Sequence, residues 1–156
     1  MFAASMALML VLGCASVPKP SRTPAGLAES AGDRTLGARA ASTARSLIGV
    51  PYGFGGASRD GFDCSGLVVY SFARAGRLGL PHSVARLDEL SRPVPIGSLE
   101  PGDLLFFRLR GWKKSHVGIY LGERRFVHAP SGGKSVEVVS FDHVYWGPRI
   151  RLAGRL

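Results

Sequence analysis

Cysteine and acidic side chains are scarce in this sequence. Its 156 residues include two cysteines, and 11 acidic side chains stand against 20 lysines and arginines, for a net charge of +9. Two cysteines are too few for a disulfide-rich scaffold. The basic residues form no long run and accompany no nucleic-acid motif, so we expect no nucleic-acid partner. The positive charge suits a general attraction to an acidic surface, or serves only to keep the protein soluble.

Long apolar segments are also absent. The apolar stretch over residues 6–12 is far shorter than the roughly 20 residues that span a bilayer, but it has the length of the hydrophobic region of an export signal. It closes with Val11-Leu12-Gly13-Cys14, which resembles the lipobox of bacterial lipoproteins. This resemblance implies a lipoprotein signal peptide over residues 1–13, cleavage before Cys14 and acylation of Cys14. The alternative is a buried N-terminal helix with an incidental cysteine.

The segment after Cys14 is rich in small and turn-forming residues. Residues 15–37 contain many Ser, Pro, Ala and Gly and almost no large apolar side chains, so they cannot bury a core. We expect residues 14–37 to form a flexible tether between a membrane and one folded domain over residues 38–156. The protein is then exported and lipid-anchored to a bacterial membrane, at the periplasmic face of the outer membrane where the host has two.

Helices are expected before strands along the domain. Apolar spacing predicts three helices, over residues 38–48, 64–75 and 84–90. Gly49 and Gly76 are expected to stop the first two, Asp63 precedes the second, and Ser83 could cap the third. Five short β-rich runs follow, over residues 103–108, 115–121, 125–129, 135–140 and 149–153. This order predicts an α+β domain with N-terminal helices packed on a central antiparallel sheet.

Cys64 stands where a glycine-rich loop is expected to enter the buried second helix. A thiol becomes a strong nucleophile when it ionises, and a helix N-terminus favours the thiolate through its dipole and its free N–H groups. The same N–H groups can hold an oxyanion. If Cys14 is acylated, Cys64 is the single thiol left in an oxidising compartment, where catalysis is a common reason to keep one. The alternative is an ordinary buried core cysteine.

His116 and His128 lie in two successive expected strands. A helix-borne thiol packed against a strand-borne imidazole such as His116 is the general Cys–His design. On an adjacent antiparallel strand, His128 could orient the first imidazole by hydrogen bonding its far nitrogen. The alternatives are two structural histidines, or a zinc site that includes Cys64, which lacks the usual short ligand spacing. We assign no chemistry to His82 and His143, which are expected in loops or at the surface.

Five motifs of the domain carry a resemblance. They are Pro51-Tyr52-Gly53-Phe54-Gly55-Gly56, Phe62-Asp63-Cys64-Ser65-Gly66-Leu67-Val68, Leu99-Glu100-Pro101-Gly102-Asp103-Leu104 leading into Phe106-Phe107, His116-Val117-Gly118-Ile119-Tyr120, and Phe126-Val127-His128-Ala129-Pro130. In this order and at these distances they resemble the NlpC-type cell-wall peptidases of the NlpC/p60 superfamily, distant circular relatives of papain. The resemblance runs from about Arg39 to Leu156 and implies a papain-like domain.

The resemblance implies a cysteine peptidase that hydrolyses peptidoglycan stem peptides, commonly at the bond between D-glutamate and a diamino acid. In the family pattern the nucleophile, the base and the orienting residue of a Cys-His-His triad are Cys64, His116 and His128. The residues expected to bind substrate beside the thiol are Tyr52, Asp63 and Ser65. A carboxylate such as Asp63 is a natural partner for the free amine of a stem peptide, and capping of the helix is its alternative role. No metal or other cofactor is expected.

One stretch departs from the family pattern. Where members often have Pro-Arg-Thr and later a Gln, this chain has Pro81-His82-Ser83 and Leu87. That stretch borders the substrate groove in the family, so the substrate preference is open. Two other functions also stay open: another wall amidase or transferase on the same scaffold, and a non-catalytic wall-binding module.

Overall fold

The computed structural model describes residues 35–109 and 115–156. The expected signal peptide, Cys14 and most of the expected tether lie outside the described residues. The described helices are α1 (Leu36–Arg45), α2 (Cys64–Ala75) and α3 (Val84–Leu90), with short 3₁₀ turns η2 (Ile96–Ser98) and η3 (Gly147–Arg149). The strands are β1 (Ala57–Ser58), β2 (Gly61–Phe62), β3 (Arg92–Pro93), β4 (Leu104–Phe107), β5 (His116–Gly122), β6 (Arg125–His128), β7 (Glu137–Ser140) and β8 (Ile150–Arg155).

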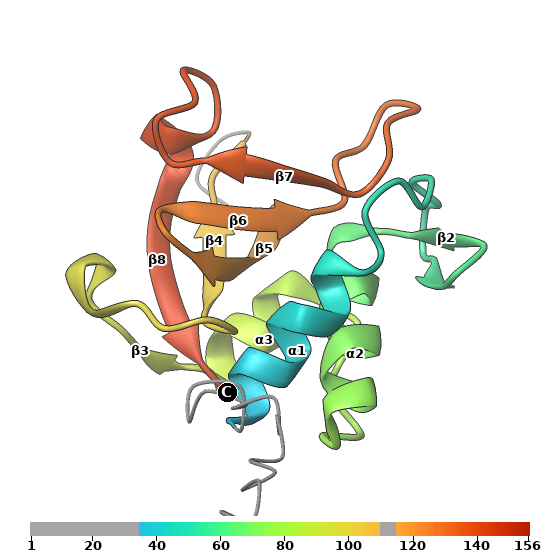
Figure 1. Ribbon diagram of the computed structural model, residues 1–156, viewed down its shortest axis with the longest axis horizontal. Helices are drawn as coiled ribbons and strands as arrows, with labels where there is room; N and C mark the ends of the chain where they lie inside the picture. Colours follow the sequence, from blue (N-terminus) through green and yellow to red (C-terminus); the bar gives the residue numbers. More distant parts are fainter. Residues whose placement is uncertain (1–34, 110–114) are drawn as a thin grey trace, which may run out of the picture.

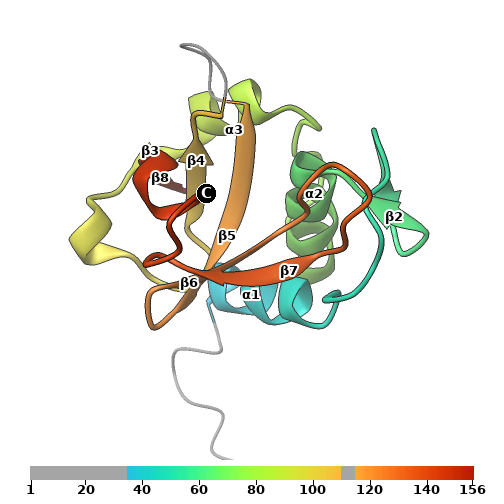
Figure 2. The same cartoon turned by 90° about the horizontal axis from the view of Figure 1, so that it is seen from above.

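Most of the described strands form one antiparallel sheet of six strands in the order β3-β8-β4-β5-β6-β7, and β1 pairs with β2 in a separate hairpin. Helices α1 and α2 lie side by side and cover one face of this sheet (Figure 1; Figure 2). The expected α+β class, with N-terminal helices packed on a central antiparallel sheet, is confirmed. None of the described helices is long and apolar enough to cross a membrane.

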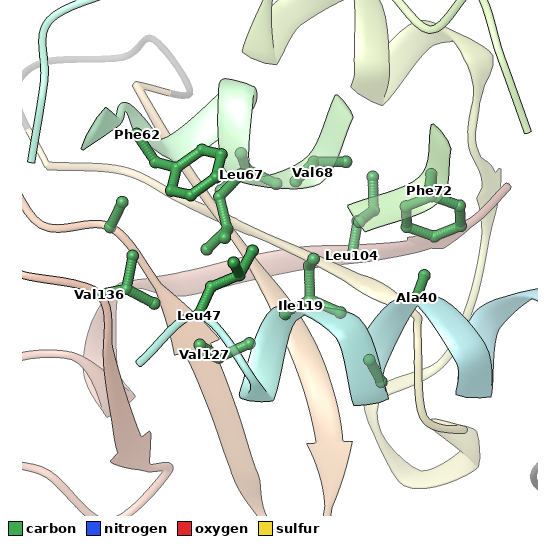
Figure 3. Packing of buried hydrophobic residues seen from close by; sticks show 14 of the residues in the cluster. Ala40, Leu47, Phe62, Leu67, Val68, Phe72, Leu104, Ile119, Val127 and Val136 are labelled. Carbon is green, nitrogen blue, oxygen red and sulfur yellow. The ribbon is translucent and has the colours of Figure 1, made fainter. Parts of the chain in front are cut away.

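The sheet has a hydrophobic core on each face, because alternate side chains of a strand point to opposite faces. On the helix side, buried Val117 and Ile119 of β5 pack with residues of α1 and α2. In Figure 3, Leu47 of this core lies among side chains of α2, β6 and the segment before β7. On the other face, Phe107, Phe126 and Trp146 belong to a second buried cluster. The expected catalytic histidines point toward this second cluster.

The first helix differs from its expected range of 38–48. It begins at Leu36, because the hydroxyl of Thr35 accepts the backbone N–H of Ala38 and caps the helix. The boundary expected between tether and domain at residue 37 therefore falls inside the first turn. The helix ends at Arg45, and the chain continues in turns that still bury Leu47, while Ile48 is 51% exposed. The predicted helix end at residue 48 is therefore wrong.

The other expected elements agree more closely with the structure. Helix α2 has the expected bounds, with Asp63 as its N-cap and Gly76 as its C-cap in the left-handed conformation. Helix α3 has the expected range, but Ser83 at its N-cap makes no side-chain capping bond. The five β-rich runs correspond to strands β4 to β8 within a few residues. Strands β1, β2 and β3 have two residues each, too few for alternation to reveal.

Candidate active site

The carboxylate of Asp63 organises the loop that enters α2. Its Oδ1 accepts the backbone N–H of Gly66 (2.7 Å) and the hydroxyl of Ser65 (3.0 Å), and its Oδ2 accepts the N–H of Gly55 (3.1 Å). The ring Nε2 of His82 lies 2.7 Å from Oδ1. These contacts hold the pKa of Asp63 below its ordinary value, against the effect of burial. The carboxylate therefore joins the glycine-rich loop, the start of α2 and the loop before α3.

Gly66 explains how these three segments come so close. A Cβ at this position would lie 1.9 Å from the carbonyl oxygen of Gly56 and 3.1 Å from Nε2 of His82. Any larger residue would push the glycine-rich loop and the imidazole away from the first turn of α2. The predicted loop position of His82 is right, since it lies exposed in the loop before α3, and the structure adds that its ring is bonded to the N-cap carboxylate of Asp63.

Cys64 is the first residue of α2 and is half-buried. Burial raises the pKa of its thiol to about 11, and the charge of Asp63 acts in the same direction. The backbone N–H groups of Val117, Ser65 and Cys64 itself act against this and stabilise the thiolate. At rest the sulfur is therefore a neutral thiol, because the helix terminus does not outweigh burial. The contact with Val117 places the sulfur against β5, one residue after His116.

His116 begins β5 and is 5% exposed. Its Nε2 lies 2.7 Å from Nδ1 of His128, and the two rings meet edge to face. Burial lowers the pKa of His116 to about 4, and Asp63 raises it slightly. The structure therefore holds a neutral imidazole on the strand that the neutral thiol contacts through Val117. With Nε2 committed to His128, Nδ1 is the ring nitrogen left for the thiol; no hydrogen bond joins His116 and Cys64 in this state.

His128 ends β6 and is fully buried. Burial holds its pKa far below the ordinary value, and the neighbouring His116, Lys134 and His143 lower it further. Its second ring nitrogen, Nε2, lies 3.4 Å from a carboxylate oxygen of Glu137. This contact falls short of hydrogen-bond geometry, and Nε2 has no hydrogen-bond partner among the described residues.

Aromatic rings enclose the histidine pair. Trp146 stacks on His116 at 5.1 Å between ring centres and meets His128 edge-on at 4.3 Å. Phe107 of β4 contacts His116 edge to face. Gly118 leaves room for this packing, because a Cβ there would lie 2.9 Å from the ring of Phe126. These rings exclude water from the imidazoles, and this is the physical cause of their depressed pKa values.

Trp146 and Glu137 are absent from the residues expected at the site. Trp146 lies directly before the 3₁₀ turn η3, where the sequence offers no signal beyond an aromatic side chain in a loop. His143 holds this loop, since its Nδ1 accepts the backbone N–H groups of Tyr145 (3.1 Å) and Trp146 (3.4 Å). Its predicted loop position is right, but it orients the segment that presents the tryptophan.

The structure brings together the residues expected at the site. Burial raises the pKa of Tyr52 most, and Cys64 and Asp63 raise it further. Tyr52 therefore lies close to both residues. Ser65 is buried and bonded to Asp63. The described residues contain no group of three or more His, Cys, Asp or Glu side chains placed to hold a metal ion. The arrangement offers a nucleophile, a proton acceptor beside it, and N–H groups at a helix start.

Comparisons with known proteins identify the family of this domain. The NlpC/P60 family model matches residues 49–155, which is more than half of the chain. This chain belongs to the NlpC/P60 family. The crystal structure of the NlpC/p60 domain of the peptidoglycan hydrolase SagA superposes with a TM-score of 0.67 and 30% sequence identity, over 77% of this chain and 98% of that domain. The family assignment and the papain-like α+β fold are thus confirmed.

Two curated relatives of this NlpC/P60 chain show how much of a longer protein it matches. A probable endopeptidase of Mycobacterium tuberculosis is 45% identical over 111 residues, covering 71% of this chain and 27% of the relative. The murein DD-endopeptidase MepH of Escherichia coli is 39% identical over 103 residues, covering 64% and 38%. The chain therefore spans about a quarter to two fifths of the length of these relatives.

Proposed function

We propose that this NlpC/P60 chain is a cysteine peptidase that hydrolyses an amide bond in the stem peptides of peptidoglycan. The observation that supports this most is the buried His116–His128 pair beside the start of α2, where Cys64 stands. Members of this family are named peptidoglycan hydrolases and murein endopeptidases, such as SagA and MepH. The same residues in a chain of this family favour the same reaction class.

In the proposed reaction, Nδ1 of His116 takes the proton of the Cys64 thiol, and the sulfur attacks the carbonyl carbon of the scissile bond. Backbone N–H groups at the start of α2 stabilise the negative oxygen of the tetrahedral intermediate. His116 then gives its proton to the leaving amine, which leaves an acyl group on the sulfur as a thioester. Water, deprotonated by His116, hydrolyses this thioester and restores the thiol.

His128 acts in this scheme as the orienting residue. Its Nδ1 accepts a hydrogen bond from Nε2–H of His116, and this fixes the ring with Nδ1 free to receive the proton. Tyr52 and Ser65 border the thiol and are proposed to contact the substrate. Asp63 already receives several donors, so an incoming ammonium would have to displace one of them. His82, an exposed side chain on a separate loop, is the natural one to yield.

Two bonds are candidates for cleavage. We propose the bond between D-glutamate and the diamino acid, which is the common choice in the family pattern. The name of MepH, a murein DD-endopeptidase, gives the alternative of a bond between two D-residues. The substitution of the usual arginine by His82 beside Asp63 lies next to the site and makes this choice an experimental question.

Digestion of purified peptidoglycan, followed by mass spectrometry of the products, tests the proposed function. We expect new fragments that begin with the free amine of the diamino acid, produced by the wild-type protein and not by Cys64→Ala. Products that differ only by loss of cross-links would identify the DD bond instead. Absence of any new fragment, with binding to the wall retained, would replace the peptidase by a wall-binding module. Transfer products without hydrolysis would indicate a transferase.

We also propose that the protein is exported and anchored by acylation of Cys14, as the Val11-Leu12-Gly13-Cys14 motif indicates. Metabolic labelling with a fatty-acid probe should mark the wild-type protein and spare Cys14→Ala. Fractionation of the membranes then locates the protein, which we expect in the outer membrane where the host has two. Equal labelling of both proteins, or of neither, would contradict the anchor.

A further inference from the structure

Glu137 is placed directly opposite His128 across the β6–β7 pair. The two residues are Cα partners in the antiparallel register, so their side chains point to the same face of the sheet. One oxygen of Glu137 lies 3.4 Å from Nε2 of His128, the buried ring nitrogen that has no hydrogen-bond partner among the described residues. We propose that Glu137 is a positioning residue that sets the tautomer of His128 and, through it, that of His116. This inference rests on the proposed function of the same site.

The argument follows from how a neutral imidazole bonds. Such a ring has one donor nitrogen and one acceptor nitrogen. A carboxylate is an acceptor, so Glu137 favours the His128 tautomer with the proton on Nε2. Nδ1 of His128 must then accept, and its partner at 2.7 Å, Nε2 of His116, must donate. Nδ1 of His116 is left with its lone pair free, and this is the form that can remove a proton from Cys64.

The other tautomer of His128 would prevent His116 from acting as a base. If His128 carried its proton on Nδ1, that N–H would donate to Nε2 of His116. His116 would then carry its own proton on Nδ1 and could not accept one from the thiol. Since the two neutral tautomers of an isolated imidazole differ little in energy, a charged acceptor at one end of the chain is enough to select between them.

The other titratable groups around His128 do not favour a proton on its ring. His116 of β5, Lys134 before β7 and His143 after β7 all oppose protonation of the ring. Among the described groups packed against the ring, Glu137 supplies the negative charge. It also stabilises the imidazolium that forms when His116 holds the thiol proton, because its negative charge lies at the other end of the hydrogen-bonded His116–His128 pair.

Glu137 can be replaced from outside, because it lines an open cavity of about 780 Å³. Lys134 and Tyr145 line the same cavity, and the side chain of Glu137 is 41% exposed. A small carboxylate such as formate can therefore enter the space that a truncated side chain leaves. This exposure also limits the expected effect, because water screens the charge.

The test compares Glu137→Ala with Glu123→Ala in the cleavage of stem peptides. Glu123 is an exposed glutamate in the turn between β5 and β6 and pairs with Arg125, so its loss removes the same charge without touching the histidines. We expect Glu137→Ala to lower kcat about two- to fivefold with KM unchanged, and Glu123→Ala to match the wild type. Sodium formate should restore kcat in Glu137→Ala alone, with sodium chloride as the salt control. No rescue by formate, or equal losses in both variants, would overturn the proposal.

Nitrogen NMR of the histidine rings gives a readout that does not depend on peptide cleavage. In the wild-type protein we expect His128 to carry its proton on Nε2, and in Glu137→Ala to show a mixture of both tautomers. A wild-type proton on Nδ1, or an unchanged tautomer in the variant, would contradict the inference. If Glu137→Ala does not fold, the wild-type tautomer alone decides. The correct tautomer in a protein without peptidase activity would instead refute the proposed function and leave the positioning intact.

Discussion

At the start of α2 the reactive sulfur lies among backbone N–H groups, whereas on β5 and β6 the two imidazoles lie among aromatic rings. The first environment is polar, and its donors come mostly from a short stretch of chain around Cys64 and Asp63. The second is dry, and β4, β5, β6 and the loop with Trp146 build it together. Both environments nevertheless keep their reactive group neutral at rest, because burial raises the pKa of the thiol and lowers that of the imidazole.

This comparison shows where activation must come from. A thiolate–imidazolium pair is costly where one partner sits in a dry aromatic cluster. The proton is therefore expected to move when substrate is bound and the negative charge can pass on to the scissile carbonyl. In the proposed reaction, the polar side then stabilises the oxyanion, and the dry side keeps the base neutral until the proton moves.

Removing the sulfur of Cys64 should have the largest effect on the cleavage rate. We expect Cys64→Ala to lower the rate of stem-peptide cleavage by about 10⁴-fold or more, because the polar helix start has no chemistry without its nucleophile. The measurement is the rate of product release from a defined stem peptide. Iodoacetamide should inactivate the wild-type enzyme at the same residue. Activity that survives the substitution would show that the sulfur is not the nucleophile.

Low pH should destabilise the fold through the buried histidine on the dry side of the site. The pKa of His116 is about 4 in the fold, below the ordinary value of 6.5. Between these values the unfolded chain binds more protons, so stability is present above pH 6.5 and is lost as the pH falls toward 4. By pH 4 this residue alone should account for about 3 kcal/mol of lost stability.

His116→Phe is the matched variant for the acid effect, since it keeps an aromatic ring in the cluster and removes the titrating group. Urea unfolding at pH 7 and pH 4 measures the difference for both proteins. The variant should lose less stability on acidification than the wild type. An identical loss in both would mean that His116 is not held neutral by burial.

Loss of the orienting ring should have a smaller effect on the reaction. His128→Ala leaves the base and the nucleophile in place but frees the ring of His116 to rotate, so we expect kcat to fall about ten- to hundredfold. KM should change little, because His128 is buried away from the substrate. The two constants are obtained from initial rates on the same stem peptide. A fall as deep as that of Cys64→Ala would make His128 a reacting group.

Substitutions of Asp63, on the polar side of the site, should have the smallest effect. Asp63→Ala removes the N-cap of α2 and should lower the free energy of unfolding by about 1 kcal/mol. Asp63→Asn keeps one acceptor for Gly66 and should lose less. If Asp63 only positions the loop, cleavage of free-amine and acetylated peptides should fall equally in Asp63→Asn. A larger fall for the free-amine peptide would show that the carboxylate also binds the substrate ammonium.

The difference between the two sides also explains what could be predicted from the sequence. Asp63, the bounds of α2 and its Gly76 stop are encoded within a few residues, so local signals are enough to place Cys64 at a helix start. The pairing of His116 with His128 follows from two adjacent strands. Strand periodicity and turn signals likewise predict the antiparallel sheet and the α+β class.

The features that the sequence did not predict depend on how distant segments pack together. Glu137 comes to lie opposite His128 because of how β6 and β7 align across a connection whose path the sequence does not specify. Trp146 reaches the histidines from a loop that His143 holds, and His82 reaches Asp63 because Gly66 lacks a side chain. Helix α1 ends at Arg45 although apolar spacing continues to Ile48, since tertiary packing of Leu47 is compatible with a turn.

The most direct test of the central claim is whether Cys64 and His116 act as one unit. The measurement is the rate of stem-peptide cleavage by Cys64→Ala, His116→Ala and the double variant, with thermal unfolding to check that each protein is folded. Because a base has no use without its nucleophile, all three should fall to a similar residual rate. A double variant that loses the product of the two single losses would contradict this account, since the two residues would then act independently.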